Sequence, residues 1–329
     1  MRSALVCLIG LTGLSYGQVG SPALGLIADH GAVRVMRGIP AAGNVDTPVD
    51  AGRTLSTIEP SPAQNFALAT DATTGEVLIV TVAADDTTAQ STTVVGATVA
   101  PDQIILSPNG TAAALLHSTT QQLDLLSGLP QTPSVQSIHT SCGPLALAVS
   151  DDGQSLACSG AASIVVVAAT GQSATLPIAG TPQALAFFHG SNAIAAISDL
   201  EVVTFADPLG AAARTLVWSK PAGSPANPQT TVGFGLSQDN SHLTITGSLG
   251  GVQTFDLSNN SGAYIDCGCT PTALAHLGGA VFRITGVESG SVKLYDAATG
   301  ELMFMPATPV RIRRPIIRTT TNSRRELEQ

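Results

Sequence analysis

Short apolar runs alternate with tight polar turns along this chain, and one strand–turn–strand phrase returns about every forty residues. The two clearest copies are residues 104–116 (IILSPNGTAAALL) and residues 145–157 (LALAVSDDGQSLA). A repeat of this length built from short apolar strands is typical of a β-propeller, in which each repeat forms one blade. The sequence therefore predicts an all-β ring of four-stranded antiparallel blades.

Six full blades can be marked along the chain, because each repeat has room for four strands and their turns. Their predicted bounds are residues 53–97, 102–140, 144–179, 182–218, 230–265 and 271–306. Residues 24–29 and 32–37 flank a His30-Gly31 turn and read as the outer half of another blade. We expect residues 309–320 to supply inner strands for it, since an open sheet edge leaves backbone groups unpaired. We favour seven blades over six with an appended hairpin.

Composition supports this fold and limits its core. Hydrophobic residues make up 44% of the chain but aromatic residues only 4%, so the core must be packed with aliphatic side chains. The first 17 residues are typical of a secretory signal peptide, with one basic residue, an apolar run and small residues before Gln18. A buried first strand is the alternative. We predict that residues 18–306 form the propeller of a secreted or periplasmic protein with no membrane span.

Charge is divided unevenly along the chain. Residues 18–306 carry 21 acidic and seven basic residues, whereas residues 307–329 carry six arginines and two glutamates. The acidic body argues against nucleic acid as a partner, because phosphate binding needs a basic face. The basic C-terminal segment is expected to be solvated and disordered, or to fold back on the ring and help to close it.

The turn phrases carry a resemblance to known propellers. Residues 107–110 (SPNG), residues 150–153 (SDDG) and the degraded residues 237–240 (SQDN) resemble the turns of the YVTN, TolB-like and WD40-like repeat families. The hairpin at residues 294–301 (LYDAATGE) is similar to the outer turns of those families. The resemblance covers nearly the whole mature chain and implies the fold. It implies no settled activity, because it is nearest to uncharacterised secreted bacterial members.

Candidate chemistry is sparse on the strands expected to line the central channel. Residues 145–149, 184–188 and 232–236 contain no acid, so a metal site or an acid–base pair is not expected there. His189 and His276 are the best polar candidates near inner strands, and a structural role is the more common one for such residues. The acidic pairs Asp85-Asp86 and Asp151-Asp152 are expected to cap turns, with calcium binding as the alternative.

Four cysteines remain after removal of the predicted signal peptide, an even number in an oxidising compartment. Because Cα atoms must lie within about 7 Å in a disulfide, the repeat favours local pairs, Cys142 with Cys158 and Cys267 with Cys269. The turn at residues 151–153 nevertheless places Cys158 nearer to Ala146 than to Cys142. Free buried thiols are the main alternative, and a redox role for the Cys267-Gly268-Cys269 segment is a further one.

These observations predict a non-enzymatic binding or scaffold module, monomeric and without a cofactor, whose partner is an unknown protein or carbohydrate. The competing hypothesis is a hydrolase of the lactonase-like propeller type, with His189 or His276 at the channel mouth. A third possibility is a ring within a larger envelope complex, docked through the arginine-rich C-terminal segment.

Overall fold

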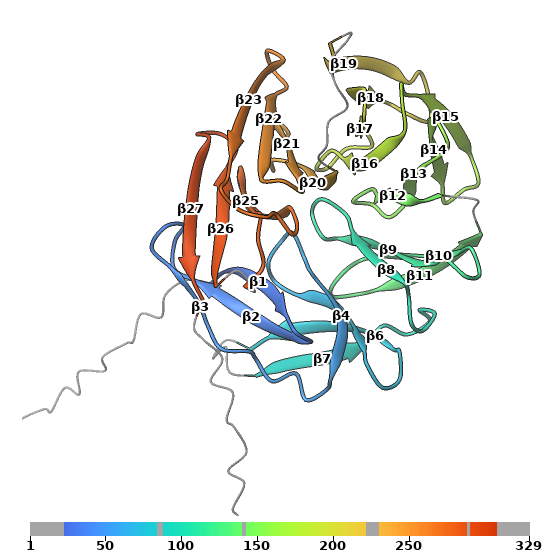
Figure 1. The fold of residues 1–329 in the computed structure, drawn as a ribbon. Coiled ribbons are helices and arrows are strands. Elements are labelled where there is room, and N and C mark those ends of the chain that lie inside the picture. The colour runs from blue at the N-terminus through green and yellow to red at the C-terminus, as the bar shows by residue number, and fades with distance from the viewer. Residues whose placement is uncertain (1–22, 84–87, 140–142, 222–229, 288–289, 308–329) are drawn as a thin grey trace, which may run out of the picture.

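The computed structural model describes residues 23–83, 88–139, 143–221, 230–287 and 290–307. In these residues seven antiparallel sheets follow one another around a ring, each formed from consecutive strands (Figure 1). Six sheets have four strands and the N-terminal sheet has three. The predicted seven-bladed all-β propeller is therefore confirmed. No helix in these segments is long and apolar enough to cross a bilayer.

The six four-stranded blades share one plan, with the strands in chain order from the channel to the rim. The innermost strands are β4 (Leu55–Pro60), β8 (Gln103–Leu106), β12 (Gly143–Val149), β16 (Pro182–Phe187), β20 (Thr231–Leu236) and β24 (Ala275–Gly278). The second strands are β5 (Ala67–Asp71), β9 (Ala112–His117), β13 (Ser155–Ser159), β17 (Ile194–Ser198), β21 (His242–Gly247) and β25 (Val281–Arg283). The third strands are β6 (Val77–Val82), β10 (Gln122–Ser127), β14 (Ser163–Ala168), β18 (Glu201–Ala206), β22 (Gly251–Asp256) and β26 (Ser291–Asp296). The outermost strands are β7 (Ala89–Thr93), β11 (Ser134–His139), β15 (Ser173–Pro177), β19 (Ala213–Ser219), β23 (Ser261–Asp266) and β27 (Glu301–Pro306).

The N-terminal blade differs from its predicted place. It consists of β1 (Ala23–Asp29), β2 (Ala32–Arg37) and β3 (Asn44–Val45). The interpretation of residues 24–37 as the outer half of a blade is wrong, because β1 contacts the innermost strand β4 and β3 contacts the outermost strand β27. The N-terminal segment thus builds the inner side of its own sheet. The predicted contribution of residues 309–320 lies outside the described residues.

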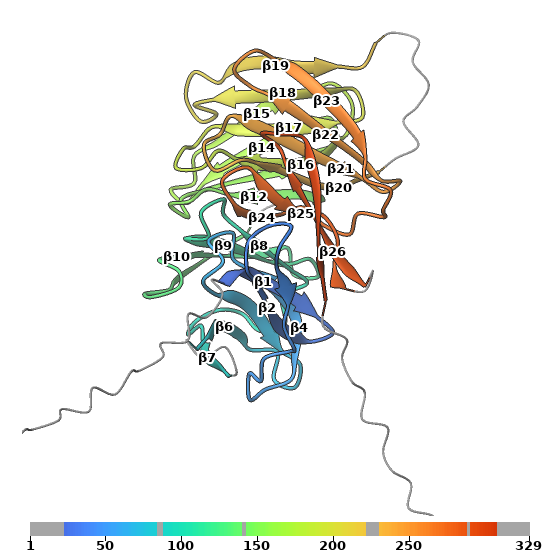
Figure 2. The ribbon, with the colours of Figure 1, turned by 90° about the vertical axis from the view of Figure 1, so that its left-hand side faces the viewer.

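Ring closure depends on side-chain packing between every pair of neighbouring blades. Seven clusters of buried hydrophobic residues occupy the seven blade interfaces of the described ring. One of them joins the first blade to the last, with Ile27 and Met36 packed against Leu294 and Met305. A parallel bridge between Val45 and Ala307 adds a backbone contact at the same junction. Both ribbon views place the first and last blades side by side (Figures 1 and 2).

The repeated turns join the innermost strand to the second strand of each blade. In the blade of β8, the amide of Ser107 donates to the carbonyl of Ala112 at 2.9 Å, and the hydroxyl of Ser107 accepts a bond from the amide of Ala112. Gly110 follows with a φ of 71°, a left-handed conformation that favours glycine. An added Cβ at Gly110 would also lie 2.1 Å from the hydroxyl oxygen of Ser61 in the preceding blade. The turn sequence therefore meets both a local and an inter-blade requirement.

Candidate functional site at the central channel

A cavity of about 510 Å³ lies where the innermost strands converge. Most of its lining residues are aliphatic or aromatic, but backbone and polar side-chain atoms make the exposed wall as polar as it is apolar. The principal apolar lining residues are Ile105, Leu106, Ala148, Leu185, Phe234 and Leu274. Concave sites that combine apolar residues with convergent polar groups are the usual form of a small-ligand pocket.

One acid lines this cavity, and sequence reasoning missed it. The three inner strands tested from sequence contain no acid, but β4 contributes Glu59 to the wall. Glu59 pairs with Leu68 and lies two residues before Ser61, the serine of its turn. Ala148 has the same position in the blade of β12, two residues before Ser150. Aligning all the repeats on their turns, instead of reading three strands alone, would have placed Glu59 at the channel.

The environment of Glu59 raises its pKa to about 7. Desolvation is the main cause, because protein atoms surround the carboxylate although its surface is open to the cavity. The positive charge of Arg283 on β25 acts in the opposite direction and lowers the pKa. Within the described part of the chain, no donor forms a hydrogen bond with the Glu59 side chain. Glu59 is thus a carboxyl group able to change its protonation near neutral pH.

Amide and hydroxyl side chains surround the end of the cavity where the inner strands begin. Gln103, Gln183, Thr231 and Thr272 line this end. The Thr231 hydroxyl donates to Gln183 Oε1 at 2.7 Å, which joins β20 to β16 in the neighbouring blade. These groups can orient a polar ligand, but they carry no charge.

The other end of the cavity, at the repeated turns, brings the two predicted histidines together. His189 follows β16 and His276 lies on β24, two blades away, yet their ring centroids are 5.3 Å apart. His276 also meets the edge of Phe282, with centroids 5.5 Å apart. Sequence reasoning named both residues but not their contact, because residues of non-adjacent blades meet only across a narrow channel.

Both ring nitrogens of His189 face protein oxygen atoms. Nδ1 lies 2.9 Å from Asn109 Oδ1, and Nε2 lies 3.3 Å from the carbonyl oxygen of Leu236. The Asn240 side chain further bonds the His189 backbone amide and carbonyl at 2.8 and 3.1 Å. His189 therefore links turns of three blades, which supports a structural role.

His276 is held differently. Its Nε2 lies 3.0 Å from the carbonyl oxygen of Gly279, which makes Nε2 the protonated nitrogen of the neutral ring. Burial lowers the pKa of His276, and the charge of His189 acts in the same direction, while the hydrogen bond to Gly279 opposes them. His276 Nδ1 is buried and has no hydrogen-bond partner in the described ranges. Gln64 Nε2 also donates to the His276 carbonyl at 2.6 Å.

The two acids at residues 151 and 152 have different hydrogen-bond partners. Asp152 Oδ1 accepts bonds from the Ser150 hydroxyl and the Gln154 amide, as expected of a turn cap. The Asp151 carboxylate instead accepts three hydrogen bonds from residues of neighbouring blades. These come from Asn109 N at 2.7 Å, Asn109 Nδ2 at 2.8 Å and Gly190 N at 2.7 Å. The described segments hold no group of three or more His, Cys, Asp or Glu side chains placed to hold a metal ion. Asp85 and Asp86 lie outside the described residues.

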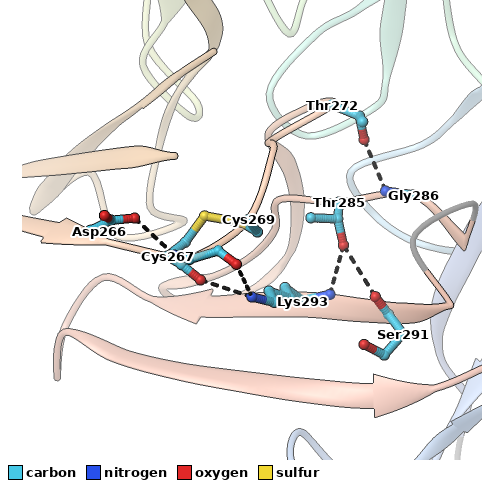
Figure 3. Close-up of a disulfide and its surroundings, with 9 residues drawn as sticks. Asp266, Cys267, Cys269, Thr272, Thr285, Gly286, Ser291 and Lys293 are labelled. Carbon is cyan, nitrogen blue, oxygen red and sulfur yellow. Dashed lines mark hydrogen bonds between the residues drawn. A yellow bond between two sulfur atoms is a disulfide. The ribbon is translucent and has the colours of Figure 1, made fainter. Parts of the chain in front are cut away.

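The disulfide of the last blade junction lies away from the channel. The structure joins Cys267 and Cys269, whose Cα atoms are 5.1 Å apart, just after β23 (Figure 3). Lys293 of the next blade donates to the carbonyl oxygens of Cys267 and Gly268 at 2.8 and 3.0 Å (Figure 3). These bonds anchor the bridged segment to β26, so its geometry suits a structural link between blades.

The predicted partner of Cys158 lies outside the described residues. Cys158 itself is fully buried on β13 and pairs with Leu147. A register shift between Gly143 and Leu147 places Gly143 opposite Ser159. The shift places Gly143, the first residue of β12, opposite the neighbour of Cys158 in β13. The Cys142–Cys158 bridge stays a prediction.

Comparisons with known proteins extend the fold assignment. No protein-family model and no curated protein sequence matches this chain. Hsv2 from Kluyvelomyces marxianus matches with a TM-score of 0.55 at 12% identity, over 87% of this chain and 97% of that protein. A "putative 6-phosphogluconolactonase" from Bacteroides uniformis matches with a TM-score of 0.56 at 16% identity, over 85% of this chain and 93% of that one. At these identities the similarity concerns the propeller fold alone.

Proposed function

We propose that this protein is an exported β-propeller that binds a protein or carbohydrate partner and does not catalyse a reaction. The observation that carries the proposal is that His189 in the cavity wall and Asp151 at the neighbouring turns are bonded to other blades. Both nitrogens of His189 face protein oxygens, and Asp151 accepts three inter-blade hydrogen bonds. A general acid or base must instead have a proton site that the substrate can reach.

The outer strands of three consecutive blades offer a surface for such a partner. Leu216 on β19, Tyr264 on β23 and Phe304 on β27 are large hydrophobic residues that are 45%, 62% and 68% exposed. Aromatic side chains contribute strongly to protein interfaces, and their faces stack on sugar rings. An exported rigid ring with these side chains at its rim is suited to binding a protein or carbohydrate partner.

Capture of partners from the envelope fraction of the source cell tests the proposal. We expect the mature protein to retain a specific protein or glycan, and the double variant Tyr264→Ala/Phe304→Ala to lose it. Exposed Leu249 supplies the matched control, since Leu249→Ala also removes a large apolar side chain but lies away from the outer strands. Equal retention by all three proteins would contradict a binding surface at these strands. Export is tested separately, by finding Gln18 at the N-terminus of the recovered protein.

The second candidate function is hydrolysis of a sugar lactone. Two observations favour it: Glu59 lies in the cavity with a pKa of about 7, and one similar structure bears the name of a 6-phosphogluconolactonase. An acid of this pKa suits proton transfer at neutral pH. Assay of 6-phosphogluconolactone hydrolysis, with and without added divalent metal, decides between the two. Turnover that Glu59→Gln abolishes would establish the hydrolase and overturn the non-enzymatic proposal.

A further inference from the structure

Glu59 differs from two other acids of the described ring, Asp124 and Glu201, in having no hydrogen-bond partner for its carboxylate among the described residues. Asp124, which is fully buried, accepts bonds from the Thr98 amide at 2.7 Å and the Ser137 hydroxyl at 2.6 Å. Glu201 is likewise bonded to Arg214 at 2.6 Å. The Glu59 carboxylate has no such donor in the described segments; its surface is open to the cavity, and the surrounding protein partly desolvates it. A partly desolvated carboxylate is costly unless a positive charge or a donor compensates it.

The wall around Glu59 indicates what could compensate it. The cavity offers no second acid, so it lacks the several oxygen ligands that a hard metal ion needs. Most of the lining residues are apolar, and Phe234 is one of them, on β20 at the far side of the channel from β4. Apolar side chains, an aromatic residue and one carboxylate are elements that recognise an organic cation.

We propose that the channel binds a small organic ammonium ion, with its charged head at the Glu59 carboxylate and its carbon atoms against the apolar wall. This site is independent of the partner surface on the outer strands. The cavity of about 510 Å³ exceeds the size of such an ion. The acidic body of the ring, with 21 acidic against seven basic residues in residues 18–306, also raises the local concentration of cations.

Three charged or titratable groups of the neighbouring elements bear on this site. Arg283 on β25 opposes a bound cation, but it is buried in the blade, outside the cavity wall, and its NH1 donates to the Thr285 carbonyl at 3.1 Å. His189 and His276 lie at the turn end of the wall, and burial lowers the pKa of His276, which disfavours its charged form. Glu59 is therefore the one wall carboxylate in the described residues that can pair with the ligand.

Protonation of Glu59 makes binding depend on pH. Only the ionised carboxylate attracts the cation, and the pKa of Glu59 without a ligand is about 7. The apparent affinity should therefore rise about tenfold per pH unit below that pKa and become constant about one unit above it. A permanently charged ligand is needed to assign this profile to the protein.

Choline and its neutral analogue 3,3-dimethylbutan-1-ol provide a matched pair of probes with the same shape. We would titrate each into the mature protein and measure dissociation constants by ligand-observed NMR. At pH 8, choline should bind at least about tenfold more tightly than the alcohol, and its affinity should fall about tenfold at pH 6. Equal binding of the two probes, or no saturable choline binding below about 10 mM, would overturn the proposal.

Two variants complete the test. Glu59→Gln should weaken choline binding at least about tenfold at pH 8 and abolish its pH dependence. Glu301→Gln removes the same charge from an exposed position at the start of β27 and should leave the affinity unchanged. Wild-type affinity in the folded Glu59→Gln variant, or equal losses in both variants, would refute a site at Glu59. If Glu59→Gln does not fold, the comparison of probes and pH values on the unaltered protein still decides.

Discussion

Asp151→Ala should destabilise the ring, because it removes the hydrogen bonds by which one side chain links three blades. The carboxylate holds the amide and side chain of Asn109 from one neighbouring blade and the amide of Gly190 from the other. Hydrogen bonds to a charged group contribute about 1.5 to 3 kcal/mol each when buried, and we take about 1 kcal/mol each for this half-buried site. The expected loss is about 3 kcal/mol. At about 2 cal/mol/K of unfolding entropy per residue, it lowers Tm by about 5 °C in a ring of this size.

Asp152→Ala is the matched control, since the same side chain is removed from the next residue. Its two bonds stay within the turn, to Ser150 and Gln154, so we expect a loss of about 1 kcal/mol and less than about 2 °C. Calorimetry gives both values, and hydrogen exchange of the Gly190 amide reports the inter-blade bond directly. Equal shifts of Tm in the two variants, or unchanged protection of Gly190 in Asp151→Ala, would refute the assignment of Asp151 as an inter-blade link.

Three further substitutions test other features of the ring. Because folding raises the pKa of Glu59 to about 7, the folded state loses stability relative to the unfolded chain as the pH rises from about 4.5 to 7. Glu59→Gln should therefore raise Tm at pH 8 and not at pH 4, and a shift independent of pH would contradict the cause. Gly110→Ala adds a Cβ 2.1 Å from a neighbouring side-chain oxygen and should lower the free energy of unfolding, measured in urea, by at least about 2 kcal/mol. Gly300 has a similar φ but lies in open space, so Gly300→Ala should lower it by about 1 kcal/mol. Thiol titration of the denatured, unreduced protein should find no free thiol at Cys267 or Cys269, and their replacement by serine should cost only about 1 to 2 kcal/mol because the closed loop is short.

The sequence predicted the repeated turns correctly because their determinants are local. A serine hydroxyl bonds back to its own turn, and Gly110 and Gly153 take the positive φ that ends it. Those turns placed the bounds of the six four-stranded blades within four residues of the observed strands. The order of strands in the N-terminal blade was not predictable in this way. It depends on which neighbour β1 contacts, and no turn signal carries that information.

The candidate site was predictable only in part, for the same reason. His189 and His276 were found as isolated polar residues at strand ends. Their contact joins two non-adjacent blades, so predicting it would require the diameter of the ring. Glu59 was missed although its position relative to Ser61 follows from the repeat. The prediction for Cys142 and Cys158 assumed a regular pairing of the two strands. The register shift between Gly143 and Leu147 cannot be read from the alternation of apolar residues.

The small side chains of the inner strands follow from the wedge shape that every blade must have. Seven sheets converge on one axis, so the space between neighbours is least at the innermost strands and greatest at the rim. Alanine and glycine therefore recur in residues 145–149, 184–188 and 232–236, and aromatic residues make up only 4% of the chain. The same geometry produces a narrow apolar channel in which a single charge is poorly solvated. Glu59 acquires its altered pKa from this convergence, and the chemistry we assign to the channel depends on it.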